Sequence, residues 1–508
     1  MKKIIILIVM LNGEMNLAAQ NVGIGTATPA FKLDVKNGSI NTDSVYRIGG
    51  NTVLSVKGTE NIFTGKGTGT ATTSGSFNAA GGFNALASNV TGNYNAAFGH
   101  MALFSSTTAS NNTAFGTSAL LSNTQGFYNA AHGVNALYYN TSGNYNTGVG
   151  SHALYLNTTG WGNTAIGSNA LYFNSVASYN TAIGHYALHR NTIGEDNTAV
   201  GTGALSANDD GEDNTAIGSQ SLEKNIWGLS NTATGSHSLE VNTAGSYNTA
   251  NGSYALGFNS TGYSNTALGG AALGTNTTGA RNTALGLDAL YSTDQSDFNT
   301  AIGYRAAGYG HNMGWNNTLV GSESDATGSG FFNSIALGNI ATINGSSQTR
   351  IGNSFTVSTG GYTGWTNISD GRYKKNVQED VKGLDFILRL RPVTYQLDVT
   401  KLSEKLNEKR GRELTPQSKM AMAEKERQLL SGFVAQEVEQ AANALGYDFS
   451  GVDRPANNND FYGLRYAEFV VPLVKAVQEQ QQMIEALQKA NEEQKRMIEK
   501  LISIVEKK

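Results

Sequence analysis

The chain has 508 residues with 61 glycines and only 5 prolines, a composition that does not describe an ordinary large globular core. It contains no cysteine, which excludes disulfides and thiolate metal sites. The net charge of −4 is unevenly spread, since residues 61–352 carry 13 acidic and 6 basic residues, whereas residues 369–508 carry 22 acidic and 23 basic ones. A mildly acidic middle region argues against nucleic-acid binding.

The N-terminal residues 1–20 have the pattern of a secretory signal peptide. Two lysines precede an apolar run from Ile4 to Leu11, and small residues follow at Ala18 and Ala19. The run is too short to cross a membrane as a helix, and no other segment is long and apolar enough. We therefore expect a secreted or cell-surface protein that is not transmembrane. Glu14 is unusual beside this run, so an uncleaved N-terminus is the alternative. Residues 21–60 are expected to form an N-terminal cap or attachment segment.

A 17-residue unit, Asn-Thr-Ala-x-Gly-x-x-Ala-Leu-x-x-Asn-x-x-Gly-x-x, occurs 14 times without insertion, with its first asparagine running from Asn78 to Asn299. A degenerate copy precedes these at Asn61, and two follow at Asn317 and Asn333. We number the places of each unit from this asparagine, which is place 0. A strict period of this length predicts a β-solenoid rod over residues 61–352. At ~4.8 Å per coil, the 14 copies would form a rod roughly 65–70 Å long.

Turn residues recur twice in each unit, as glycine at place 4 and usually asparagine at place 11. The unit therefore predicts a coil with two brief strands, and in-register stacking would align the asparagines as hydrogen-bonded ladders. Alanine at places 2 and 7 is usually followed by a larger apolar residue at places 3 and 8. Because adjacent residues in a strand point to opposite faces, we expect one face to fill the coil and the other to contact neighbouring protomers.

The repeats contain the motifs NTAIG at Asn163, Asn180, Asn214 and Asn299, and NTALG at Asn265 and Asn282. Through these motifs the repeats resemble the collagen-binding-type heads of trimeric autotransporter adhesins. That resemblance implies a left-handed β-roll assembled from three chains. The coil of this chain is a few residues longer than is usual for those heads.

The composition becomes charged and helical after a linker at residues 353–368. Residues 401–430 are rich in Lys, Glu, Leu and Met and predict a solvated helical insertion. A long helix is expected from Tyr466, and residues spaced alternately by three and four predict a coiled coil over 466–507. An amphipathic helix on a globular face is the alternative, because Gln480 and Gln494 weaken the seam. The seam comprises Val470, Leu473, Val477, Gln480, Ile484, Leu487, Asn491, Gln494, Ile498, Leu501 and Val505.

The segment Ser369-Asp370-Gly371-Arg372-Tyr373-Lys374 is the one candidate catalytic motif. A serine hydroxyl is a weak nucleophile until a base removes its proton, and a lysine can do so if burial or nearby positive charge lowers its pKa. Five residues apart, the two side chains would lie on different sides of a regular helix, but a turn at Asp370-Gly371 could bring them together. Taken alone, this spacing has little specificity.

Four blocks in order give the motif its context: SDGRYKKNV from Ser369, GLDFILRLRPVTYQLD from Gly383, GFVAQEVEQ from Gly432 and YAEFVVPLVKAVQEQQ from Tyr466. Residues 369–508 thereby resemble the endosialidase-type intramolecular chaperone domain, peptidase family S74. The resemblance implies a domain that guides homotrimer assembly and then cuts itself off. It makes Ser369 the nucleophile, Lys374 the general base, Ile368-Ser369 the bond broken, and Asp370 and Arg372 supporting residues, with no cofactor.

Two further features of the rod each have a functional interpretation and a simpler structural one. Aromatic residues at place 16 could stack on sugar rings of a surface glycan, but packing along the rod is the simpler interpretation. They are Phe77, Tyr94, Tyr128, Tyr145, Tyr179, Tyr247 and Phe298. Acidic residues between Glu195 and Asp213 could hold calcium, with a solvated loop as the default, so no metal site is assigned.

Together these features predict an exported homotrimeric surface fibre, an adhesin with a surface glycan or host-surface ligand as its expected partner. Its C-terminal domain is expected to be a serine endopeptidase that acts once in cis. The rod itself is not expected to be an enzyme. A phage-derived tail fibre or receptor-binding protein is the first alternative. A polysaccharide-degrading rod is the second, and it would need paired carboxylates in a groove.

Overall fold

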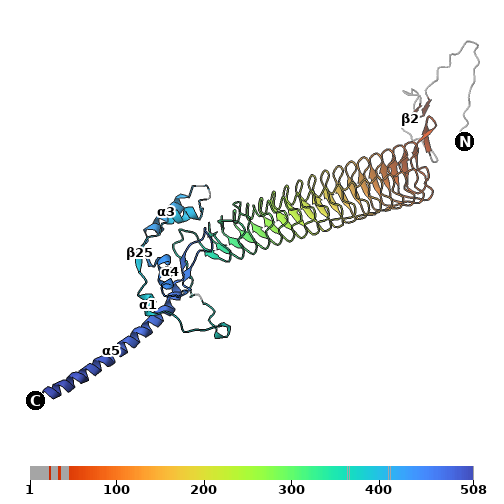
Figure 1. Cartoon of the computed structure of the whole chain (residues 1–508). Coiled ribbons are helices and arrows are strands. Elements are labelled where there is room, and N and C mark those ends of the chain that lie inside the picture. The colour runs from red at the N-terminus through yellow and green to blue at the C-terminus, as the bar shows by residue number, and fades with distance from the viewer. Residues whose placement is uncertain are drawn as a thin grey trace, which may run out of the picture.

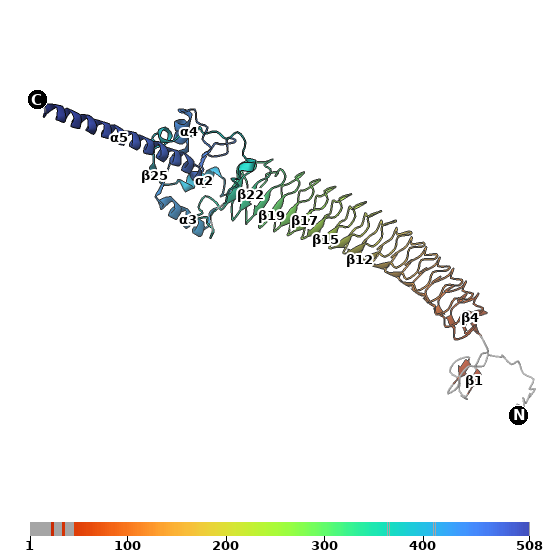
Figure 2. The ribbon, with the colours of Figure 1, turned by 90° about the horizontal axis from the view of Figure 1, so that it is seen from below.

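The computed structural model describes residues 22–24, 33–35, 45–362, 364, 366–409, 411 and 413–506. A long rod leads to a small domain of helices and short strands, and a single helix projects beyond that domain (Figure 1). Seen from below, the rod curves gently along its length (Figure 2). The rod is a β-solenoid of about 17 turns with 17-residue spacing, which confirms the predicted fold class. The expected signal peptide lies outside the described residues.

The rod is held together by a ladder of parallel strands, each formed by places 1–3 of a coil. Neighbouring coils pair in register, so that Thr164, Ala165 and Ile166 lie opposite Thr181, Ala182 and Ile183. The ladder strands are β5 (Ile62–Thr64), β6 (Ala79–Gly81), β7 (Ala96–Phe98), β8 (Thr113–Phe115), β9 (Ala130–His132), β10 (Thr147–Val149), β11 (Thr164–Ile166), β12 (Thr181–Ile183), β13 (Thr198–Val200), β14 (Thr215–Ile217), β15 (Thr232–Thr234), β16 (Thr249–Asn251), β17 (Thr266–Leu268), β18 (Thr283–Leu285), β19 (Thr300–Ile302), β20 (Thr318–Val320), β22 (Ile335–Leu337) and β24 (Thr349–Ile351).

The prediction of two strands per coil is wrong for most of the described rod. A second strand pair, β21 (Asp325–Ala326) with β23 (Thr342–Ile343), occurs near its C-terminal end. Elsewhere the leucine at place 8 has a left-handed backbone, as in Leu171 with φ of 51°. Its N–H still donates to the next coil, from Leu171 to the carbonyl of Ala187 at 3.0 Å, so the backbone hydrogen bonds between coils continue without a strand.

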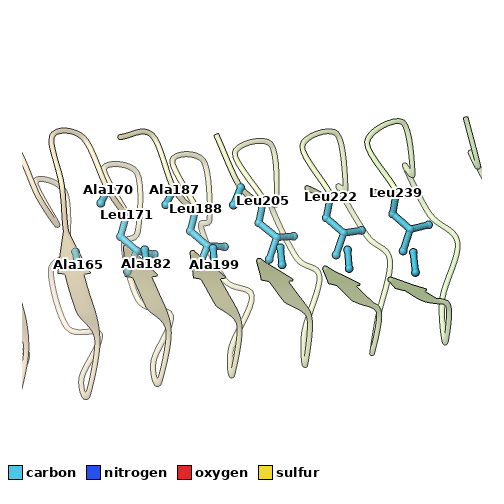
Figure 3. Close-up of a cluster of buried hydrophobic side chains, with 14 of the residues drawn as sticks. Ala165, Ala170, Leu171, Ala182, Ala187, Leu188, Ala199, Leu205, Leu222 and Leu239 are labelled. Carbon is cyan, nitrogen blue, oxygen red and sulfur yellow. The ribbon is translucent and has the colours of Figure 1, made fainter. Parts of the chain in front are cut away.

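The left-handed leucine also changes which residues form the core. The side chains of Ala170 and Leu171 both point into the coil and are fully buried, together with Ala165 at place 2 (Figure 3). The expected opposite faces therefore hold for places 2 and 3, but not for places 7 and 8. Each buried leucine contributes about 1.5–3 kcal/mol relative to an exposed one.

Two asparagine ladders run through the interior of the rod, as predicted. The copy assigned to Asn333 is one residue out of register, because Ser334 holds place 0 of that coil and donates its backbone N–H to Oδ1 of Asn317 at 3.1 Å. At place 0 the backbone N–H of Asn95 donates to Oδ1 of Asn78 at 2.9 Å, and Nδ2 of Asn95 donates to the carbonyl of Ala109 at 2.9 Å. At place 11 the amide of Asn157 donates to Oδ1 of Asn140 at 2.8 Å. These buried amides form hydrogen bonds both within and between coils, which stabilises each coil's position on its neighbour. Among the described residues, Oδ1 of Asn89 and Oδ1 of Asn276 are exceptions without a hydrogen-bond partner.

The N-terminal end of the rod is covered by a hairpin of β3 (Val45–Ile48) and β4 (Asn51–Ser55). Strand β4 pairs antiparallel with β5, so the first coil does not present an open strand edge on that side. A separate parallel pair is formed by β1 (Val22–Ile24) and β2 (Leu33–Val35).

The C-terminal domain packs around Phe386, Val438 and Phe449, which are buried in one apolar cluster. No helix in the described part of the chain is long and apolar enough to cross a membrane. The elements after the rod are a 3-10 turn (Gly371–Tyr373), α1 (Leu384–Ile387), β25 (Val393–Tyr395), α2 (Val399–Lys405), α3 (Pro416–Arg427), β26 (Leu430–Gly432), α4 (Ala435–Asn443), β27 (Val452–Asp453), β28 (Gly463–Leu464), a second 3-10 turn (Tyr466–Phe469) and α5 (Val470–Val505).

Helix α5 projects away from the domain (Figure 1), and the apolar residues of its predicted seam, such as Leu473, Ile484 and Leu501, are exposed in the single chain. The coiled coil stays a prediction. The helical insertion at residues 401–430 contains most of α2 and all of α3.

Candidate active site

The turn that follows Ser369 brings the two candidate catalytic side chains together. The backbone N–H groups of Tyr373 and Lys374 donate to the carbonyls of Asp370 and Gly371, at 3.1 and 3.2 Å, which closes one turn of 3-10 helix. The Nζ of Lys374 then lies 2.9 Å from the Oγ of Ser369. The structure thus shows the contact that the sequence left conditional on a turn at Asp370-Gly371.

Asp370 caps this turn and pairs with Arg372. Its Oδ1 accepts the backbone N–H of Arg372 at 2.9 Å, and its Oδ2 accepts Nε of Arg372 at 2.9 Å. These hydrogen bonds hold the pKa of Asp370 below its usual value, and the same pairing raises the pKa of Arg372. The two predicted supporting residues therefore act on the backbone of the turn, and they contact each other.

The peptide bond that precedes Ser369 is open to solvent. Ile368 is 92% exposed as a residue, and residues 366–370 have no regular secondary structure. Ser369 and Lys374 are also exposed in the single chain. The pair is therefore accessible to solvent. Burial of Lys374 would favour its neutral form, and such burial would have to come from contacts with other chains.

Two glycines explain how the sequence blocks of the domain meet. A Cβ on Gly383 would lie 2.6 Å from Oε2 of Glu479 on α5, which accepts the N–H of Leu384 at 2.7 Å. A Cβ on Gly432 would lie 2.2 Å from the hydroxyl of Tyr466. Glycine at these positions lets the second and third blocks approach the long helical segment closely, which joins the four blocks into one domain.

A polar contact between the rod and the domain was not anticipated from the sequence. Glu408, which follows α2, is only 2% exposed and accepts the backbone N–H of Ser354 at 2.9 Å and also its hydroxyl. Nearby, the amide of Asn344 donates to the carbonyl of Asn459 at 3.1 Å. The insertion was expected to be solvated, but this part of it is buried against the end of the rod. The partners are 54 residues apart, and no local pattern marks them.

The packing interpretation of the aromatic residues at place 16 gains support. At place 16, Phe77 stacks on Tyr94 with ring centroids 4.8 Å apart, as expected for packing along the rod. In the described part of the chain, no group of three or more His, Cys, Asp and Glu residues is placed to hold a metal ion, so the acidic cluster between Glu195 and Asp213 has no geometric support as a calcium site.

These features define a fibre-like protein, in which a solenoid rod precedes a small domain whose first residues form a Ser-Lys contact. A family model described as chaperone of endosialidase, Peptidase_S74, matches residues 369–447, which confirms the resemblance of the C-terminal domain. At the level of the family, this match implies self-cleaving peptidase activity. No curated protein matches the chain.

Proposed function

We propose that the protein is an exported, homotrimeric surface fibre whose C-terminal domain directs trimer assembly and then releases itself by cutting the Ile368-Ser369 bond. The observation that carries the cleavage is the 2.9 Å contact between Lys374 Nζ and Ser369 Oγ, directly after an exposed peptide bond. The rod and the matched domain together fit a tail-fibre-like trimeric protein.

In the proposed reaction, unprotonated Lys374 takes the proton of the Ser369 hydroxyl. The Ser369 oxygen attacks the carbonyl carbon of Ile368, the carbon–nitrogen bond breaks, and the Ser369 nitrogen takes the proton from Lys374. Water then hydrolyses the ester between Ile368 and Ser369. The products are a rod that ends in the Ile368 carboxylate and a released domain that begins with Ser369. Asp370 and Arg372 hold the turn that aligns the two reacting side chains.

The apolar stripe at place 3 supports assembly with other copies. These side chains point away from the coil and stay about 40% exposed in the single chain, as in Phe115 at 41% and Ile166 at 40%. Place 3 is Phe, Val, Ile or Leu in 10 of the 14 copies of the unit that follow one another without insertion. The stripe is interrupted at Gly81, His132, Thr234 and Asn251, and an exposed apolar stripe of this extent marks an interaction surface. We assign it to the neighbouring protomers of the trimer.

The physical reason for a removable C-terminal domain is the register of the rod. Because the 17-residue units share the same core residues, chains can pair in a shifted register with little loss of local contacts. Three long chains therefore need their ends aligned before they assemble along their length. The unpartnered apolar seam of α5 would bring three chains together at one end and raise their effective concentration. Cleavage then leaves a rod that persists because its unfolding is slow.

The intact mass of the full chain tests the cleavage. We expect two fragments that separate between Ile368 and Ser369 in the wild type and in the control variants Thr366→Ala and Lys375→Ala. The Ser369→Ala and Lys374→Ala variants should stay whole. Native mass spectrometry of the N-terminal fragment should give three chains. An uncut wild type would remove the peptidase claim, and a monomeric rod would remove the trimer.

Export is tested separately from cleavage. Residues 1–20 fused to a reporter protein should carry it out of the cytoplasm in a bacterial host, whereas a fusion with Ile4 to Leu11 made polar should not. A reporter that stays inside in both cases would favour the tail-fibre alternative.

A further inference from the structure

One edge of the rod varies in chemistry from coil to coil, in contrast to the core. This edge, which we call the loop edge, is formed by places 6, 9 and 10. Positions that pack against the same neighbour in each coil keep one residue type, as the alanines and leucines of the core do. Variable positions therefore face solvent. Place 6 is occupied in chain order by Asn84, Met101, Ser118, Asn135, His152, Asn169, Tyr186, Gly203, Gln220, His237, Tyr254, Ala271, Asp288 and Arg305.

Two small residues in one coil open a hollow in the loop edge. Ala271 at place 6 and Gly274 at place 9 lie at the floor of a hollow of about 620 Å³. Tyr254 and Phe258 line it on the N-terminal side, and Tyr291 lines it on the C-terminal side. Phe258 is 58% exposed, and a Cβ on Gly274 would lie 2.8 Å from the ring of Tyr291. The hollow thus has aromatic walls, and its size is that of a small-ligand site.

A charged pair lies at the C-terminal side of this hollow. Nε of Arg305 donates to Oδ2 of Asp288 at 3.0 Å, and both side chains are partly exposed. The guanidinium lies 5.2 Å from the ring of Tyr304 and 5.6 Å from that of Tyr309. These contacts fix a hydrogen-bond donor and an acceptor side by side beside the aromatic walls.

A second hollow with similar components lies on the same edge. It measures about 460 Å³ and is lined by Tyr186, His189 and Arg190 on one side and by Gln220 and Glu223 on the other. Its floor is Gly203, where a Cβ would meet only Gln220, at 3.6 Å. Gly203 and Ala271 both occupy place 6 and are 68 residues apart (271 − 203), which is four coils. At ~4.8 Å per coil, the two hollows are about 19 Å apart along the rod.

We propose that these two hollows are subsites for one neutral saccharide chain that lies along the loop edge. Aromatic side chains present flat apolar faces to the C–H faces of sugar rings. The paired donors and acceptors, Arg305 with Asp288 and Gln220 with Glu223, suit hydroxyl groups, which both donate and accept hydrogen bonds.

Neighbouring opposite charges and the acidic balance of the rod disfavour a polyanion as the ligand. The proposal names a ligand class for the proposed surface fibre, but it does not depend on self-cleavage. Its test can therefore fail while the cleavage proposal stands, and the reverse also holds.

The rod itself supplies substitutions that fill the hollows without removing a contact. Tyrosine is accommodated at place 6 in two other coils, at Tyr186 and Tyr254, with φ of 57° and 58°. A double variant with Ala271→Tyr and Gly203→Tyr should therefore fold and close both hollows. Met101→Tyr adds a tyrosine at the same place far from either hollow and is the matched control. Tyr254→Ser removes one aromatic wall, and serine is already present at place 6 in Ser118.

The measurement is isothermal titration of the full chain with cellohexaose, xylohexaose, mannohexaose and maltohexaose, with polygalacturonate as a polyanion. We expect at least one neutral hexasaccharide to bind the wild type and the Met101→Tyr control equally. The filled double variant and Tyr254→Ser should bind it at least about 10-fold more weakly, or about 1.4 kcal/mol. Failure of every neutral hexasaccharide to bind would overturn the proposal. Unchanged binding by the filled variant, or binding of polygalacturonate alone, would also overturn it.

Discussion

Lys374 Nζ lies 2.9 Å from Ser369 Oγ across a single 3-10 turn, so the whole candidate dyad is built within six consecutive residues. Local hydrogen bonds of Asp370 hold the turn that sets the geometry of the pair. Both side chains are exposed in the single chain, and burial of the pair in the assembled fibre would make the lysine a better base.

Replacing Lys374 by arginine should abolish self-cleavage. Arginine keeps the positive charge and the hydrogen-bond donors, but a guanidinium stays protonated and cannot accept the serine proton. Because a positioned base contributes about 10²–10⁴-fold in rate, the Lys374→Arg chain should stay whole on the time scale of wild-type cleavage. The intact mass followed over time measures this, with Lys375→Arg as the control. Cleavage at the wild-type rate in Lys374→Arg would show that the amine is not the base.

Asp370 should titrate at unusually low pH. Its hydrogen bonds to Arg372 lower its folded-state pKa, so the stabilisation of the turn is fully present above the unfolded value of about 3.9. It is lost as the pH falls through the lower, folded value. Carbon-detected NMR of the Asp370 carboxyl should therefore show a pKa below about 3.9 that returns toward it in Arg372→Ala. An unchanged value in that variant would contradict the ion pair.

The rod could be predicted from sequence because its signal is local and repeated. Glycine at place 4 adopts φ near 140°, as in Gly133 at 143°, and asparagine at place 0 forms the ladder. The left-handed leucine at place 8 could not be predicted, since that conformation costs about 1–2 kcal/mol for a residue with a side chain. In the rod, burial of Leu171 and its hydrogen bond to Ala187 offset the cost. Only the stacked coils provide both the burial and the hydrogen bond.

The candidate site also has one part that the sequence predicts and one part that it does not. The turn that joins Ser369 to Lys374 follows from Asp370 and Gly371, which are turn residues. The contact between Glu408 and Ser354 spans 54 residues and depends on how the domain meets the rod. No sequence periodicity links those two residues, so only the structure shows that the insertion reaches the rod.

Restoring one interrupted ladder should stabilise the N-terminal half of the rod. At place 11, Asn89 is followed by Ser106, and among the described residues Oδ1 of Asn89 and Oγ of Ser106 are buried without a hydrogen-bond partner. In Ser106→Asn the new amide could donate to Asn89, as Asn157 donates to Asn140. The expected gain is about 1 kcal/mol.

Backbone amide exchange around residues 103–123 should slow about fivefold in Ser106→Asn, with Ser105→Asn at the half-buried neighbouring place as the control. Faster exchange, or an equal effect in the control, would contradict the role of the ladder.

A methyl group at place 4 should disrupt coil stacking. A Cβ on Gly133 would lie 2.4 Å from the carbonyl oxygen of Gly150, so Gly133→Ala must push two coils apart. Gly310→Ala is the matched control, because Gly310 also has a positive φ, of 85°, but meets nothing within 4 Å. The steric difference between the two variants should be about 1–3 kcal/mol, measured by urea unfolding of the rod. Equal stability would show that the coils can separate freely at place 4.

After cleavage, the C-terminal domain should leave the rod slowly, and the contact of Glu408 with Ser354 should set the rate of its release. The carboxylate of Glu408 accepts two hydrogen bonds from Ser354 in a buried contact. Because Ser354 precedes the cleaved bond and Glu408 follows it, this contact still joins the two fragments after cleavage. Glu408→Gln replaces one acceptor oxygen by a donor, which should cost about 1–3 kcal/mol and speed release at least several-fold. Size-exclusion chromatography at intervals after cleavage measures the co-eluting fraction, with Glu413→Gln, an exposed glutamate of the same insertion, as the control. In the uncleaved Ser369→Ala chain, the same substitution should also speed exchange of the Ser354 amide. Immediate release of the wild-type domain, or equal release in both variants, would show that the contact does not hold the domain.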